Sequence, residues 1–255
     1  MRIFSVSRFL SILLLFVAAA LPARAETLVG SNIDSRVVVA IKTAPDGVQG
    51  WMPEGWTSVP FPAGPLQGAN LLLVMIDGRL EMDAEGKPLS PPSRRAAALV
   101  GLARQDDGDA VRMFVLRVYT TAPDRDPYGN AMQAGIARES ALTGPADGAR
   151  ESADFWRVVT DSGGQLALRL NYTTGRRGWT PGALFPHSAV NPEFSRIYRY
   201  EQMVDLVSST AVGKPLTGEF KLTSTVLELA GIFDGSEEVI AVMDVPVYVR
   251  KVYLP

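Results

Sequence analysis

A strict two-residue alternation of apolar and polar side chains marks residues 165–172 of this chain. Leu166, Leu168, Leu170 and Tyr172 fall on one face of the segment, and Gln165, Ala167, Arg169 and Asn171 fall on the other. Such alternation is typical of a β-strand with one buried face. Similar patterns predict eight further strands, at residues 36–42, 69–76, 95–103, 111–120, 155–160, 197–207, 219–227 and 239–252. The sequence therefore predicts a mainly β fold.

Three short segments between these strands contain residues that tolerate the positive φ angles of hairpin turns. They are 106–109 (Asp-Asp-Gly-Asp), 161–164 (Asp-Ser-Gly-Gly) and 234–236 (Asp-Gly-Ser). Each predicts a hairpin, so neighbouring strands are expected to pair antiparallel. About nine antiparallel strands imply a closed or nearly closed β-barrel or a double sheet.

One segment, residues 128–142, predicts a helix. Met132, Ile136 and Leu142 give it an apolar stripe, and Asp126 precedes it as an N-cap. The expected architecture is therefore α+β, with one main helix beside the strands. The proline-rich and glycine-rich segments 45–65 and 175–194 are expected to be long loops, which either cover a site or pack on their own aromatic side chains.

The first 25 residues have the pattern of a secretory signal peptide. Arg2 and Arg8 precede an apolar run at residues 9–21, and the segment ends in Ala-Arg-Ala at 23–25. The apolar run is shorter than the ~20 residues of a spanning helix. We expect cleavage after residue 25, secretion or export to a bacterial periplasm, no stable membrane insertion, and one domain at residues 26–255.

Composition excludes many kinds of chemistry. The chain of 255 residues has no cysteine and one histidine, which excludes disulfides, thiolate nucleophiles, iron–sulfur clusters and sites that need two imidazoles. After residue 25 it carries 22 basic and 27 acidic residues, so a nucleic-acid partner is not expected. The acidic residues at 77, 81, 83 and 85 do not have the spacing of a calcium loop. No metal and no cofactor are expected.

Two segments carry a resemblance to a known family. Residues 37–56 (VVVAIKTAPDGVQGWMPEGW) form a strand that leads into a Pro-Glu-Gly motif, and residues 131–139 (AMQAGIARE) end in an Arg-Glu pair. In this order they resemble the acetoacetate decarboxylase superfamily, with a two-residue insertion before the Arg-Glu pair. The resemblance implies a β-barrel-like fold whose cavity is partly closed by a helix, with Arg138 and Glu139 near that cavity.

The chain departs from that family at its catalytic position. The family uses a lysine that forms a Schiff base, and a second lysine lowers the pKa of the first. The corresponding residues here, 140–147 (SALTGPAD), contain no lysine, and the chain has none between Lys87 and Lys214. The resemblance therefore implies the fold and the cavity without this chemistry.

Five residues are candidates for ligand binding. Trp51, Trp56 and Trp179 lie in the two long loops and would form an aromatic lid if both loops cover one barrel mouth, or else would cap the ends of the core. Arg138 or Arg36 would orient a carboxylate or carbonyl group. The leading interpretation is an exported protein that binds a small organic ligand, mostly apolar or bearing a keto or carboxylate group, in the barrel.

Two residues are candidates for catalysis. Glu139 or His187 would serve as acid or base in a cofactor-free lyase, hydrolase or isomerase on the same barrel. His187 could equally be a loop histidine bonded to backbone carbonyls. An interaction module of the cell envelope is a third interpretation, and the sequence predicts no oligomeric state.

Overall fold

A computed structural model describes residues 26–255, and the predicted signal peptide lies outside them. Its strands form one large mixed sheet in the order β12-β8-β7-β6-β5-β4-β3-β1-β13-β11-β9, with β2 attached to β4 and β10 attached to β5. Neighbours pair antiparallel except at β5–β6 and β5–β10, which are parallel. The ladder ends at β12 and β9, so the sheet is not closed.

The elements have the following bounds. The strands are β1 (Thr27–Lys42), β2 (Trp56–Val59), β3 (Leu71–Met82), β4 (Arg94–Gln105), β5 (Val111–Thr120), β6 (Ala131–Thr143), β7 (Glu151–Thr160), β8 (Gln165–Thr173), β9 (Gly178–Leu184), β10 (Pro186–Ser188), β11 (Ile197–Ser209), β12 (Gly218–Ser224) and β13 (Glu238–Leu254). The helical segments are α1 (Pro45–Gln49) and the single turns η1 (Gly64–Leu66), η2 (Pro123–Arg125) and η3 (Leu227–Leu229).

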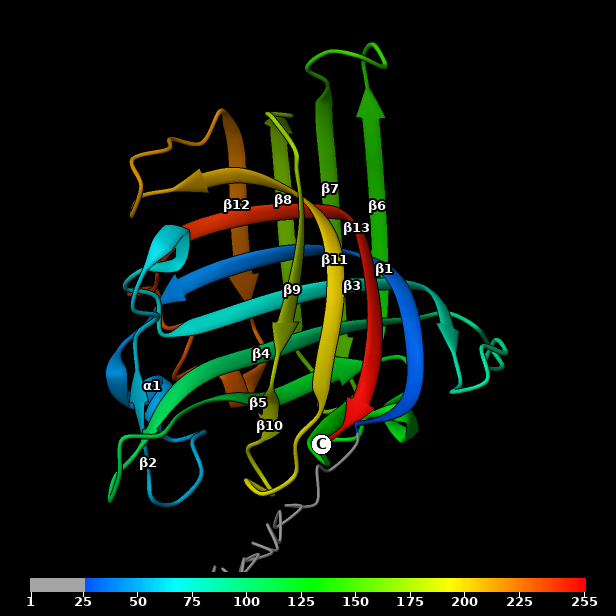
Figure 1. Ribbon diagram of the computed structural model, residues 1–255. Coiled ribbons are helices and arrows are strands. Elements are labelled where there is room, and N and C mark those ends of the chain that lie inside the picture. Colours follow the sequence, from blue (N-terminus) through cyan, green and yellow to red (C-terminus); the bar gives the residue numbers. More distant parts are fainter. Residues whose placement is uncertain (1–25) are drawn as a thin grey trace, which may run out of the picture.

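The sheet folds into two layers that cross steeply (Figure 1). Strands β5, β4, β3, β1, β13, β11 and β9 form a curled front layer, and β6, β7, β8 and β12 form the layer behind it. Strand β6 links the layers because its first three residues pair with β5 and the rest pair with β7. At the opposite edge β10 follows β9 after a single residue and pairs with β5, which brings the curled layer back toward its own start.

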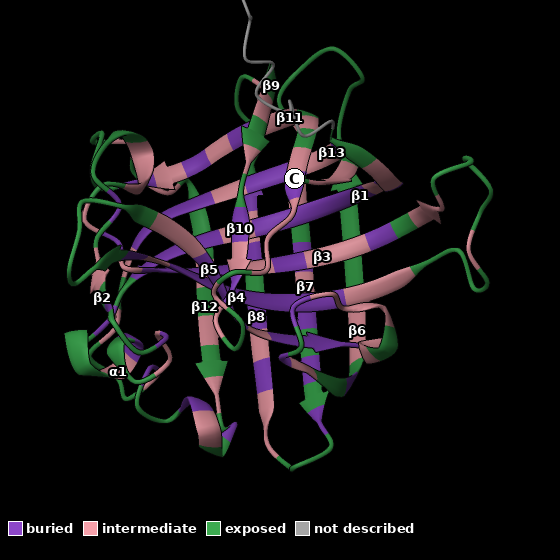
Figure 2. Ribbon diagram, turned by 60° about the horizontal axis from the view of Figure 1, so that its bottom comes forward, coloured by how far each residue is buried: buried purple, intermediate pink, exposed green. Residues whose placement is uncertain are grey.

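The fold has two apolar cores, and one of them holds the two layers together. The larger core lies between the layers, where Val39 of β1 and Leu73 of β3 pack with Trp156 of β7 and Leu168 of β8. The second core covers the other face of the front layer, and Ala40 and Leu72 belong to it. Strands β1 and β4 therefore carry long buried runs (Figure 2). Burial of both faces explains why these strands are nearly continuously apolar.

The helix predicted at residues 128–142 is wrong, because β6 occupies most of this segment. Ala134, Ile136 and Arg138 point into the interface between the layers and alternate with more exposed residues. Pairing with β5 and β7 on either side outweighs the helical preference of the alanines and methionine. Asp126 caps no helix and instead accepts a hydrogen bond from the backbone N–H of Tyr128 at 3.0 Å.

The two segments predicted as loops contain short regular elements. α1, β2 and η1 lie within residues 45–66, and β9 and β10 lie within residues 175–194. Among the described residues, α1 is the α-helix of the fold, and it has five residues. No helix in residues 26–255 is both long and apolar enough to span a bilayer.

The other local predictions are largely confirmed. Each of the nine predicted strands lies within or overlaps an observed strand, and β5 has the predicted bounds. The turns at 106–109 and 161–164 join β4 to β5 and β7 to β8 as hairpins. The turn at 234–236 was expected to be a hairpin, but it joins η3 to β13, and β12 pairs with β8 instead.

Candidate functional site

On several strands the apolar residues that face the opposite layer give way to polar ones at the same end of the interface. This change runs from Val37 to Ser35 on β1, from Met75 to Asp77 on β3, from Ile136 to Arg138 on β6, from Trp156 to Asp154 on β7, from Leu170 to Tyr172 on β8, from Val207 to Asp205 on β11 and from Val242 to Asp244 on β13. Hydrogen bonds across the interface and within the back layer connect six of these polar residues, and Asp205 is the ladder partner of Asp244. We call these seven residues, Ser35, Asp77, Arg138, Asp154, Tyr172, Asp205 and Asp244, the inter-layer polar cluster.

Arg138 joins the two layers within this cluster. Its Nε and Nη2 donate to the two carboxylate oxygens of Asp154 at 3.0 and 2.6 Å. Its Nη1 donates to Ser35 Oγ at 2.6 Å and to Asp77 Oδ2 at 3.2 Å, and its guanidinium lies 4.7 Å from the ring centre of Trp156. Four of its five N–H groups donate hydrogen bonds, so the guanidinium group of Arg138 is held in one position and connects strands of both layers.

The arginines also set the charge state of Asp77. Burial alone would raise the pKa of this carboxyl, but the hydrogen bond and charge of Arg95, together with the charge of Arg138, hold the pKa below its usual value. Burial likewise works against the charge of Arg138, and Asp154 outweighs it, so the pKa of Arg138 is raised. Asp77 and Arg138 are therefore ionised and closely paired.

The other half of the cluster is a pair of buried carboxylates beside a phenol. Asp205 on β11 and Asp244 on β13 are direct partners in the ladder. Tyr172 Oη donates to Asp244 Oδ2 at 2.6 Å, and the backbone N–H of Gly175 donates to Asp205 Oδ2 at 2.7 Å. The remaining oxygen of Asp205 is buried and has no hydrogen-bond partner. A buried acceptor without a donor is costly in a purely structural role.

Burial shifts the acidity of both partners in the hydrogen bond between Tyr172 and Asp244. It raises the pKa of Asp244, and the nearby charge of Asp154 acts in the same direction, although the hydrogen bond from Tyr172 opposes it. Burial and the neighbouring carboxylate of Asp244 also raise the pKa of Tyr172. Asp244 is thus a carboxylate with increased proton affinity in a site shielded from water, which is a property of general bases.

Two cationic side chains lie at the rim of the site, near Asp205 and Asp244 but not hydrogen-bonded to them. Arg177 Nη2 lies 4.0 Å from Asp244 Oδ2, and Lys214 Nζ lies 4.0 Å from Asp205 Oδ1. Both distances exceed a hydrogen bond. Arg177 Nε is buried without a partner, whereas Lys214 Nζ donates to the backbone carbonyl of Leu206. The rim can therefore offer positive charge to an anionic group next to the two aspartates.

No group of three or more His, Asp or Glu side chains in residues 26–255 is arranged to hold a metal ion. The cluster offers a proton-accepting group at Asp244, with positive charge from Arg177 and Lys214 beside it. Arg138 fixes the geometry of the strands that carry these groups.

Arg36, the second predicted ligand-binding arginine, lies on the opposite face of β1 from Ser35. Its Nε and Nη2 donate to the two oxygens of Asp34 at 2.6 and 2.9 Å, and its guanidinium lies 3.5 Å from the ring centre of Tyr248. Burial would lower the pKa of Arg36, but Asp34 outweighs it and the pKa is raised. Arg36 is a paired cation in the second core, away from the cluster.

The three predicted lid tryptophans occupy different environments. Trp56 begins β2, is buried, and makes an edge contact with Phe114 at 4.9 Å between ring centres. Trp51 packs against the larger core with Arg117 over its ring. Trp179 lies on the edge strand β9 and is 51% exposed. Trp56 therefore belongs to the larger core, and Trp51 packs against it.

Neither predicted acid–base residue lies in the cluster. Glu139 follows Arg138 on β6 and so points to the outer face of the back layer, where it borders a shallow groove of about 240 Å³. His187 lies on β10, where its Nδ1 is 2.9 Å from the carbonyl of Pro192. Burial lowers the pKa of His187. His187 is thus bonded to a backbone carbonyl, and it lies on a short strand and not in a loop.

Comparison with known proteins identifies the fold. No model of a known protein family matches the chain, and no curated protein sequence matches it. Among solved structures, the enduracididine biosynthesis enzyme MppR, complexed with pyruvate, superposes with a TM-score of 0.55 at 12% identity over 89% of each chain. The chain has the acetoacetate decarboxylase-like fold. An acetoacetate decarboxylase-like enzyme from Sphingomonas wittichii RW1 gives a TM-score of 0.54 at 14% identity, over 90% of this chain and 91% of that one.

The superposition on these structures confirms the acetoacetate decarboxylase-like fold that the resemblance of residues 37–56 and 131–139 implied. It does so although the latter segment is strand β6 and not a helix. At these identities the likeness concerns the fold alone, and the site has to be argued from its own residues.

Proposed function

We propose that the protein is exported and binds a small organic acid at the inter-layer polar cluster, where Asp244 acts as the proton-accepting group of a cofactor-free lyase or isomerase. The observation that carries the proposal is the buried pair Asp205–Asp244, with an unpartnered carboxylate oxygen and two loosely held cations beside it. Buried titratable groups with shifted pKa values concentrate at functional sites.

The roles follow from the positions of the groups. Arg177 and Lys214 would pair with the carboxylate of the ligand, since each lies 4.0 Å from its present acidic neighbour. Asp244 would remove a proton from the carbon next to a carbonyl, and the electron pair of that C–H bond would move to the carbonyl oxygen as an enolate. Positive charge at the rim would stabilise this enolate. The solved MppR complex with pyruvate suggests a small keto acid as the first probe.

The test is exchange of the methyl protons of pyruvate in deuterated buffer, followed by NMR. The protein without residues 1–25 is expected to catalyse exchange, and Asp244→Asn to reduce it on the order of 100-fold or more, since general-base groups typically contribute that much. Arg177→Gln is expected to raise KM with a smaller effect on kcat. Arg104→Gln, at an exposed position of β4, is the matched control.

Binding without exchange would reject the catalytic role and leave the binding protein of the leading sequence interpretation. Failure of pyruvate and longer 2-keto acids to shift any NMR signal of the protein would reject both. Export is tested separately by expressing residues 1–255 in a bacterium and determining the N-terminus of the periplasmic fraction, which is expected to be Glu26.

A further inference from the structure

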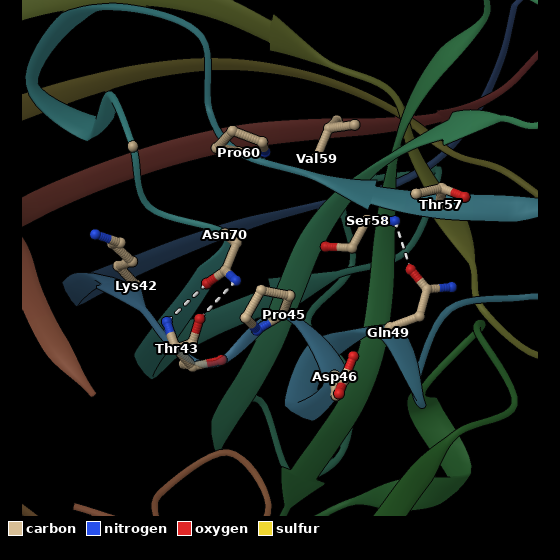
Figure 3. A pocket seen from close by; sticks show the side chains of 11 residues that line it. Lys42, Thr43, Pro45, Asp46, Gln49, Thr57, Ser58, Val59, Pro60 and Asn70 are labelled. Atoms are coloured by element: carbon tan, nitrogen blue, oxygen red, sulfur yellow. Dashed lines mark hydrogen bonds between the residues drawn. The ribbon is translucent and has the colours of Figure 1, made fainter. Parts of the chain in front are cut away.

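A cleft lies beside α1 and β2, at the C-terminal end of β1 (Figure 3). Its volume is about 470 Å³, within the range of about 300 to 1,000 Å³ typical of small-molecule sites. Its lining comes from the ends of β1 and β3, from α1, and from β2 and the segment after it. It shares no residue with the inter-layer polar cluster.

Two side-chain amides hold the walls of this cleft. Asn70 Oδ1 accepts from the backbone N–H of Thr43 at 2.9 Å, and Asn70 Nδ2 donates to the carbonyl of Thr43 at 3.1 Å. Gln49 Oε1 accepts from the backbone N–H of Ser58 at 2.8 Å, and Gln49 Nε2 donates to the carbonyl of Trp56 at 3.0 Å. Each amide thus bonds a strand end as a neighbouring peptide group would, which makes the walls rigid before any ligand arrives.

Three polar groups of the lining remain available. The Lys42 ammonium is 3.7 Å from Glu238, and both side chains are largely exposed, so this ion pair is weak. Asp46 is exposed in the first turn of α1. The Ser58 hydroxyl oxygen is shielded from solvent and has no hydrogen-bond partner. Figure 3 shows Lys42 and Asp46 on different sides of Pro45.

We propose that this cleft binds a short zwitterionic molecule of dipeptide size. Lys42 would receive its carboxylate, Asp46 would receive its ammonium group, and Ser58 would complete a hydrogen bond to it. Pro45, Val59 and Pro60 provide an apolar lining between these groups. One cation and one anion in one cleft match a ligand that carries both charges several bonds apart better than they match a simple anion.

The experiment measures dissociation constants by NMR titration for four probes that differ in which of the two terminal charges they carry. These are alanyl-alanine, its amide, its N-acetyl derivative, and the N-acetyl amide. Alanyl-alanine is expected to bind best, and removal of either charge to weaken binding about fivefold, as for one partly exposed ion pair. Lys42→Met should abolish the preference for the acid over the amide, and Asp46→Asn the preference for the free amine.

Lys87→Met changes a lysine at an exposed turn and is the control, expected to bind all four probes as the unchanged protein does. Each variant is compared with the unchanged protein by circular dichroism to show that it is folded. The proposal is overturned if the four probes bind equally, if none binds at millimolar concentration, or if Lys42→Met and Lys87→Met have the same effect. None of these results depends on activity at the inter-layer polar cluster.

Discussion

Asp205 and Asp244 face each other across neighbouring strands β11 and β13, with both side chains buried between the two layers of the sheet. If both carboxylates were ionised, their negative charges would repel each other unless hydrogen-bond donors or cations stabilised them. The structure stabilises them differently, because Asp244 accepts a hydrogen bond from the hydroxyl group of Tyr172 and Asp205 accepts one from the backbone N–H of Gly175. This difference makes Asp244 the residue whose protonation can be tested.

The first prediction concerns the pH dependence of stability at Asp244. Its pKa is raised in the folded state, so its contribution is fully present below the unfolded value of about 3.9 and is lost as pH rises through the folded pKa. The variant Asp244→Asn lacks the titrating carboxyl group, so it does not lose this stability as pH rises. The free energy of unfolding of the variant, relative to the unchanged protein, should therefore increase from pH 4 to pH 8, by about 1.4 kcal/mol for each unit of pKa shift.

Urea unfolding of both proteins across this pH range measures the difference. Tyr172→Phe is the companion variant, because loss of its hydrogen bond should raise the pKa of Asp244 further. Parallel stability curves for the unchanged protein and Asp244→Asn would show that this carboxyl has an ordinary pKa.

The second prediction concerns Arg138. Replacement by methionine removes the partner of Asp154 and one partner of Asp77 while keeping an unbranched side chain at the site. Leaving a buried charge without its partner typically costs about 3–5 kcal/mol, and urea unfolding should show a loss of this size. The double variant Arg138→Met with Asp154→Leu should recover part of it. An equal or larger loss in the double variant would mean that packing, and not charge pairing, dominates.

The third prediction uses the single histidine of the chain. Burial lowers the pKa of His187, so its neutral form is favoured in the folded state. Its contribution to stability is present above the unfolded pKa of about 6.5 and is lost as pH falls below it. An NMR titration of its ring protons, which are unambiguous because there is one histidine, should give a midpoint below 6.5. A midpoint at or above that value would contradict this environment.

Local alternation predicted most strands because each inner face is apolar over several residues. β8 shows this well, since buried and less buried residues alternate from its first residue to its last. The segment of β6 predicts a helix because small residues lie next to its apolar residues Ala134 and Ile136. The spacing of the segment therefore fits both the two-residue repeat of a strand and the 3.6-residue repeat of a helix. Only pairing with β5 in one layer and β7 in the other decides in favour of a strand.

The site was predictable only in part. Arg138 was selected through a family resemblance, yet its partners Ser35, Asp77 and Asp154 come from strands that are far apart in sequence. Asp205 and Asp244 belong to no motif. The one signal in the sequence is that an alternating apolar face ends in a charged residue, as in Val242 followed by Asp244. That signal indicates a site only once the strand register shows that the polar residues of several strands lie at the same end of the interface.

The last prediction concerns close packing of β9 against β11. A Cβ atom at Gly182 would lie 2.4 Å from Tyr200 Oη and 2.5 Å from its Cζ. The ring of Tyr200 stacks on Tyr248 at 4.9 Å, and Tyr248 in turn lies under Arg36, so the ring is not free to move aside. Gly182→Ala should therefore lower the free energy of unfolding by about 1–3 kcal/mol, as overpacking typically does.

Gly178 on the same strand provides the matched control, because a Cβ there would meet no atom within 4 Å. Gly178→Ala should leave the urea midpoint nearly unchanged. In a protein that already carries Tyr200→Leu, Gly182→Ala should lower the free energy of unfolding by less than it does beside the tyrosine, since the clashing ring is gone. If Gly182→Ala and Gly178→Ala had equal effects, the packing of β9 on the Tyr200–Tyr248 stack would be looser than the structure has it.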